Sequence, residues 1–166
     1  MWQSHPFFAL NLVAALVAAL GAVAAWRRRP TSGAAPLAAL MAGVCLWCFA
    51  SAIGLLRADL AGKLFWANVS YLGVALVPAS WLAFALQYTD HPAGRRPRAL
   101  APLAIEPLLV LLLLWSGDQQ GLFRRELRLA DAGGLAMLDV LRGPAFWLHT
   151  VYAYLLLLLG SVVLLH

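Results

Sequence analysis

Residues 65–90 read FWANVSYLGVALVPASWLAFALQYTD, a stretch apolar enough to lie in a membrane. It nevertheless carries polar side chains and a proline that simple membrane spanning does not require: Asn68, Ser70, Tyr71, Pro78 and Gln87. A lipid-embedded segment must satisfy its backbone hydrogen bonds internally, so a run of this length is predicted to be a helix. Its polar side chains predict a helix bundle whose interior has a role beyond anchoring.

The composition indicates an integral membrane protein. Of the 166 residues, 63% are hydrophobic and 11% are charged, whereas a soluble domain has about 25% charged residues. The net charge of +5 does not indicate a nucleic-acid partner, because the arginines cluster at the ends of apolar runs. We therefore expect one transmembrane domain over residues 1–166 in the cell membrane, with the lipid bilayer as its surroundings.

The apolar runs predict an all-α bundle of five transmembrane helices. The expected spans are residues 7–26, 34–56, 64–88, 99–116 and 145–165. A membrane β-barrel is excluded because these runs do not alternate polar and apolar residues at strand length. The only lysine, Lys63, is expected in the loop before the third span.

The positive-inside rule orients the bundle with its N-terminus outside. Two loops on one side carry a dense set of arginines: Arg27, Arg28, Arg29, Arg95, Arg96 and Arg98. The first span is not a signal peptide, because no basic residue precedes it. Five spans then place His166 on the cytoplasmic side, and the chain looks like part of a larger protein.

Residues 117–144 are long for a connection between helices, and long loops are often functional. Two short runs of strand-like residues flank the turn signal Asp131-Ala132-Gly133-Gly134. This pattern predicts a β-hairpin on the extracytoplasmic side between the fourth and fifth helices. A disordered polar loop is the alternative.

Polar and aromatic side chains recur at similar depth in the outer halves of several spans. Partners three or four residues apart share a helix face. We hypothesise a ligand pocket beneath the hairpin formed by Trp47, Ser51, Asn68, Tyr71, His149 and Tyr152. The alternative is hydrogen bonding between helices together with an interfacial aromatic belt.

Glu106 is the only carboxylate inside a predicted span, and Pro107 follows it directly. Proline removes a backbone donor and bends a helix, so Glu106, Pro107 and Pro78 are candidates for a proton-sensitive or hinge-linked switch. The alternative is a side chain that only supports the bend. Cys45 and Cys48 are expected to be packing residues, and no catalytic site, metal site or cofactor is predicted.

The order and spacing of several short motifs resemble the N-terminal seven-transmembrane sensor region of bacterial and archaeal histidine kinases, also found on diguanylate cyclases. The resembling residues include Leu64-Phe65-Trp66, Tyr71-Leu72-Gly73, Pro78, Trp81, Phe84, Tyr88-Thr89, Glu106-Pro107, Gly121-Leu122-Phe123, Gly143-Pro144, Phe146-Trp147, His149, Tyr152 and Tyr154. Two positions depart from the family: Gly117 and Gln120 stand where it often has Asn and His.

The resemblance implies a signal-sensing input module rather than an enzyme. It implies two further helices and a cytoplasmic output domain, a histidine kinase or diguanylate cyclase, beyond the fifth helix. The partner would be an unknown small molecule or membrane stimulus, and homodimerisation is left open. A transporter fragment and a rhodopsin-like receptor are the alternatives, but the first lacks paired charges within the spans and the second lacks a lysine deep in a late helix.

We predict that Arg27–Arg29 and Arg95–Arg98 face the cytoplasm and that the 117–144 loop faces outward. Single cysteines introduced in these loops and labelled from outside intact cells test this orientation. Labelling of the 95–98 loop from outside would contradict it.

Overall fold

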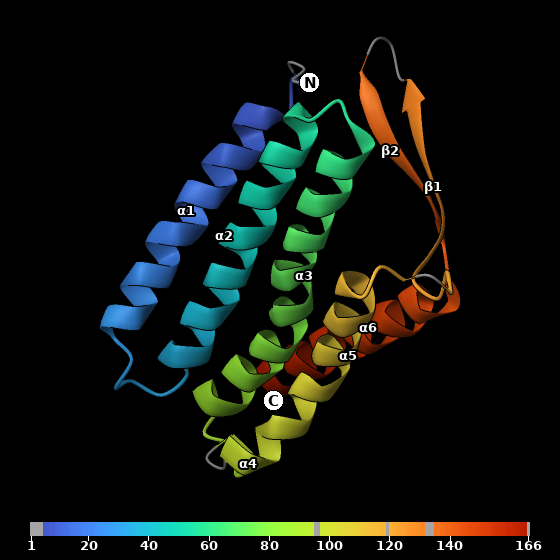
Figure 1. Ribbon diagram of the computed structural model, residues 1–166. Coiled ribbons are helices and arrows are strands. Elements are labelled where there is room, and N and C mark those ends of the chain that lie inside the picture. The colour runs from blue at the N-terminus through green and yellow to red at the C-terminus, as the bar shows by residue number, and fades with distance from the viewer. Residues whose placement is uncertain (1–4, 95–96, 119, 132–134, 166) are drawn as a thin grey trace.

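The computed structural model describes residues 5–94, 97–118, 120–131 and 135–165, and it is mostly helical (Figure 1). Among these described residues, four helices are long and apolar enough to cross a membrane: α1 (Phe8–Arg27), α2 (Ala34–Leu56), α3 (Leu60–Tyr88) and α6 (Pro144–Leu165). These bounds agree with the predicted spans to within a few residues. Arg95, Arg96, the turn at 132–134 and His166 lie outside the described residues.

The predicted fourth span, 99–116, is not one continuous α-helix. It consists of a short helix α4 (Pro97–Leu100), a 3₁₀ turn η1 (Ala101–Ala104) and the helix α5 (Ile105–Trp115). Proline has no backbone N–H, so Pro102 and Pro107 each remove a helical hydrogen bond. The apolar helical stretch Ala101–Trp115 is consequently shorter than the other four.

Helix α3 begins four residues earlier than predicted because Asp59 caps it. The Asp59 carboxylate accepts a hydrogen bond from the backbone N–H of Gly62 at 2.7 Å, which satisfies a donor that the first helical turn leaves open. This bond and the Arg57 side chain lower the pKa of Asp59 to about 2. As a result Lys63, expected in a loop, lies in the first turn of α3 and is buried.

The predicted hairpin is present. Strand β1 (Arg124–Asp131) pairs antiparallel with β2 (Ala136–Arg142), with an irregularity in register between Arg124 and Glu126. The hairpin lies at the same end of the bundle as the start of α1 and the connection from α2 to α3, whereas α4 lies at the opposite end (Figure 1). It is therefore placed beside the first turns of α3.

Helix α3 is the centre of the bundle, packing against α2, α5 and α6. Its closest approach is to α2, where Gly73 faces Gly43: a Cβ on Gly73 would overlap the carbonyl oxygen of Gly43 and lie 2.7 Å from the Trp47 backbone nitrogen. Small residues of this kind let helix backbones approach in a membrane. In contrast, α5 and α6 present exposed leucines to their surroundings, as lipid-facing helices do.

We predict that Gly73→Ala destabilises the bundle by about 1–3 kcal/mol, the usual cost of overpacking a close contact. Gly54→Ala is the matched control, because a Cβ there meets only the Trp66 Cβ at an ordinary 3.4 Å. Unfolding of both variants in mixed micelles measures the difference. Equal stability of the two variants would contradict the packing described.

Candidate functional site

An aromatic cluster joins the base of the hairpin to the helices. Phe123 is 1% exposed, and its ring meets Tyr71 of α3 edge-on at 5.1 Å and Phe146 of α6 at 5.6 Å. His149 of α6 lies 6.3 Å from both Phe123 and Tyr71, measured between ring centroids. The cluster anchors the start of β1 at the place where α3, α5 and α6 meet.

The turn that delivers Phe123 is organised by Asp118. This residue adopts a positive φ of 45°, and its carboxylate accepts hydrogen bonds from the backbone N–H groups of Leu122, Phe123 and Arg124 at 2.6–2.8 Å. Three such bonds fix the direction in which the chain leaves α5. The hairpin base is therefore held by local backbone geometry as well as by packing.

Asn68 connects α3 to both α5 and the hairpin. Its amide donates to the carbonyl oxygen of Leu114 at 3.3 Å, and its side-chain oxygen accepts from the Arg124 guanidinium at 2.5 Å. Arg124 also lies over the Tyr71 ring, 5.7 Å from its centroid. Burial lowers the pKa of Arg124 from its usual range, although an arginine remains charged in proteins.

Glu106 is not isolated in the bundle, because it pairs with His149. The Oε1 atom of Glu106 lies 2.9 Å from Nδ1 of His149, and the histidine is 3% exposed. A contact of this length requires one proton between the two atoms. The other polar atom of each side chain, Glu106 Oε2 and His149 Nε2, has no hydrogen-bond partner among the described residues. The pair thus links α5 to α6 while keeping two unused polar atoms in a buried position.

Tyr152 supplies the hydrogen bond that Pro107 removes. A residue at position 107 would ordinarily donate its N–H to the carbonyl oxygen of Leu103, but proline has no such donor. The Tyr152 hydroxyl of α6 donates to this carbonyl oxygen at 2.7 Å. Tyr152 therefore compensates for the proline in the neighbouring helix.

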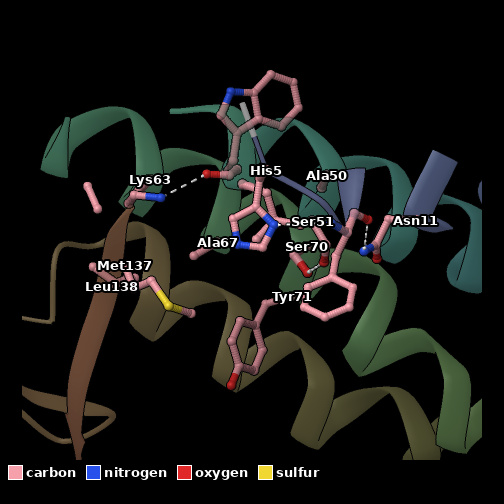
Figure 2. A pocket seen from close by; sticks show the side chains of 15 residues that line it. His5, Asn11, Ala50, Ser51, Lys63, Ala67, Ser70, Tyr71, Met137 and Leu138 are labelled. Carbon is pink, nitrogen blue, oxygen red and sulfur yellow. Dashed lines mark hydrogen bonds between the residues drawn. The ribbon is translucent and has the colours of Figure 1, made fainter. Parts of the chain in front are cut away.

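A pocket of about 460 Å³ lies between the first turns of α3, helices α1 and α2, and strand β2 (Figure 2). Its polar lining includes His5, Asn11, Lys63 and the hydroxyls of Ser51 and Ser70, which lie 3.3 Å apart. Its apolar lining includes Phe7, Ala50, Trp66, Met137 and Leu138. No group of three metal-binding side chains is found among the described residues.

The six hypothesised ligand residues do not line one cavity. Ser51 and Tyr71 line the pocket. Asn68, His149 and Tyr152 are not in its lining and instead contact Arg124, Glu106 and the Leu103 carbonyl. Trp47 lies on α2 with 44% of its surface exposed. Of the hypothesised switch residues, Glu106 and Pro107 lie beside this network and Pro78 is buried inside α3.

Sequence reasoning missed three features of the site. The early start of α3 places Lys63 in the pocket, and the Asp59-to-Gly62 spacing of a helix cap was the available signal. The hydrogen bonds of Asp118 were only weakly indicated in the sequence, by the glycine three residues later at position 121. The Glu106–His149 pair had no signal beyond the rarity of ionisable side chains inside the spans.

The chain belongs to a known family of membrane sensor regions. Residues 10–166 match the family described as the N-terminal 7TM region of histidine kinase. The protein is therefore a membrane sensor module of the histidine kinase type, and this region of such proteins is not catalytic. No curated protein and no solved structure gives a significant match to the chain.

We predict energetic coupling between Glu106 and His149. Removing one partner leaves the other buried without its hydrogen bond, so the costs of Glu106→Leu and His149→Leu should sum to more than the cost of the double variant. The expected coupling free energy is about 1 kcal/mol, within the range of residues in contact. A double-mutant cycle of unfolding in mixed micelles measures this coupling. A second cycle, with Glu106→Leu and Ser161→Ala, is the uncoupled control. Additive effects for the Glu106–His149 pair would show that the contact does not bind α5 to α6.

Proposed function

We propose that this module senses an extracytoplasmic or membrane stimulus at its hairpin end and passes it to a cytoplasmic output domain. The observation that carries the proposal is the position of α3. Its first three turns line the pocket, and further along it Trp81 donates its indole N–H to the Leu157 carbonyl oxygen of α6 at 3.1 Å. One helix thus contacts both the place where a stimulus would act and the helix that follows the hairpin.

The proposed orientation rests on where the basic residues lie. Arg27 ends α1, Arg28 and Arg29 follow it, and Arg98 lies in α4. Both segments are at the end of the bundle opposite the hairpin (Figure 1). The arginines at the hairpin end include two in ion pairs, Arg57 with Asp59 and Arg128 with Glu126. The positive-inside rule then favours an extracytoplasmic hairpin and N-terminus in an inner or plasma membrane.

In this orientation the segment α4–η1–α5 also crosses the membrane, as the fourth of five crossings in chain order. It begins near the end of α3 and leads into the hairpin at the other end (Figure 1). Its broken helix is tolerable in lipid where a neighbouring side chain satisfies a freed carbonyl, as Tyr152 does for the Leu103 carbonyl that Pro107 leaves without a donor. We propose five spans for this chain, of the seven that the family description states.

The stimulus would act by favouring one of two arrangements of α3 and α6. A ligand shifts such an equilibrium only through different affinities for the two states. Ser51 and Tyr71 would contact the ligand in the pocket, and Trp47 would respond to the change on the adjoining face of α2. The change would pass to α5 and α6 through three residues: Asn68, His149 and Tyr152. Glu106, Pro107 and Pro78 are the proposed switch or hinge. The proposed output domain is a histidine kinase or diguanylate cyclase, and we propose that the protein forms a homodimer.

Substitution of Pro78 tests the coupling. Pro78→Leu restores a backbone N–H inside α3 and should change the basal output of the full-length protein, with normal membrane insertion. We expect a change of roughly fivefold, which corresponds to a coupling free energy of about 1 kcal/mol. The readout is autophosphorylation from ATP in isolated membranes, or cyclic-dinucleotide synthesis if the output domain is a cyclase.

The matched control for this experiment is Pro92→Leu, because Pro92 is exposed and lies in the turn after α3. Its output should equal that of the unmodified protein. Unchanged basal output of Pro78→Leu would remove α3 from the signalling path.

A further inference from the structure

The pocket beneath strand β2 contains a buried cation whose hydrogen-bonding capacity is mostly unused. Lys63 is 6% exposed, and among the described residues its ammonium group donates one hydrogen bond, to the Gly54 carbonyl oxygen at 3.3 Å. Figure 2 shows this bond directed towards the α2 wall of the pocket. An ammonium group has three donors, so two remain for another acceptor.

No carboxylate lines this pocket within the described part of the chain. Asp59 is near enough to attract Lys63, but its oxygens are held by the Gly62 N–H and by Arg57 at 2.8 Å. A buried charge is costly unless it is paired. The pocket therefore has a positive group with room for a negative one beside it.

The remainder of the lining is mostly apolar. Phe7 of the N-terminal segment, Trp66 of α3, and Met137 and Leu138 of β2 lie around the space. Its volume, about 460 Å³, falls in the range of small-molecule sites, roughly 300–1,000 Å³. This combination of one cation and an apolar chamber fits an amphipathic anion.

We infer that the pocket binds a small amphipathic carboxylate, with its anionic group on the Lys63 ammonium and its hydrocarbon part against Trp66, Met137 and Leu138. The inference deepens the proposed sensing function by naming the chemical class of the ligand, and it rests on that function only for its consequence in signalling. Two of the contacts belong to the hairpin, so an occupied pocket joins β2 to α3. A free carboxylate and an anionic membrane lipid share this chemistry, and the experiment below separates them.

The test is calorimetric titration of decanoate into the protein in nanodiscs of zwitterionic lipid, with empty nanodiscs subtracted. We expect saturable binding to one site per chain. Lys63→Met should weaken it about tenfold or more, because the charge-assisted hydrogen bond is lost, and Lys63→Arg should retain it. Decanol, which lacks the charge, should bind more weakly than decanoate to the unmodified protein. Arg128→Met is the matched control, since it removes an exposed positive charge on the hairpin.

A second pair of variants covers the case in which Lys63→Met does not fold. Met137 is 44% exposed on β2 and lines the pocket, so substitution there is tolerable for folding. Met137→Glu should weaken decanoate binding by repulsion, whereas Met137→Gln, of the same shape without the charge, should not. Decanoate binding that is unsaturable, or equal in Met137→Glu and Met137→Gln, would overturn the inference.

Nanodiscs that contain phosphatidylglycerol identify the source of the anion. If phosphatidylglycerol abolishes the Lys63-dependent binding of decanoate, the site belongs to an anionic membrane lipid. If decanoate binding is unchanged by phosphatidylglycerol, the site belongs to the free carboxylate. Autophosphorylation of the full-length protein with and without decanoate is measured separately. If decanoate binds through Lys63 but autophosphorylation does not change, the binding site is supported and only the proposed sensing function is contradicted.

Discussion

The structure depends on the requirement that carbonyl groups without a helical partner find a donor inside an apolar bundle. Water is absent from the core of a bilayer, and an unsatisfied backbone group there costs several kcal/mol. The Leu103 carbonyl, deprived of its donor by Pro107, receives the Tyr152 hydroxyl. The Leu114 carbonyl near the end of α5 receives the Asn68 amide. The Gly54 carbonyl near the end of α2 accepts from the Arg57 backbone N–H at 3.3 Å and also receives the Lys63 ammonium. These bonds explain why helices that span a membrane carry side chains that spanning alone does not need.

Two of these bonds, together with one from Trp81, join α3, α5 and α6. Asn68 and Trp81 project from α3 to α5 and α6, and Tyr152 projects from α6 back to the 3₁₀ turn before α5. A hydrogen bond of this kind contributes only about 0.6 kcal/mol in a membrane protein. In the proposed function, the set is strong enough to specify an arrangement and weak enough that a ligand with a few kcal/mol of differential affinity would exchange it for another.

The sequence predicted the elements well and their contacts poorly, for a physical reason. Apolar runs and turn residues act locally, so the long helices and the hairpin could be placed to within a few residues. The depth of a side chain along its helix could also be estimated, and this placed Asn68 and Tyr71 near the hairpin. The rotation of each helix depends on packing, such as the close approach of Gly73 to Gly43, and this information is not local. For that reason the pairing of His149 with Glu106 was not predicted, and Lys63, assigned to a loop, lines the pocket.

The most direct test of this account asks whether the Tyr152 hydroxyl stabilises the bundle because residue 107 is a proline. Tyr152→Phe removes the hydroxyl donor, and Pro107→Ala returns the backbone donor to the Leu103 carbonyl. Unfolding free energies in mixed micelles are compared for Tyr152→Phe in the two backgrounds. The account predicts a cost of about 0.6–1.7 kcal/mol with Pro107 present, reduced by half or more when Pro107 is replaced by alanine. An equal cost in both backgrounds would contradict it.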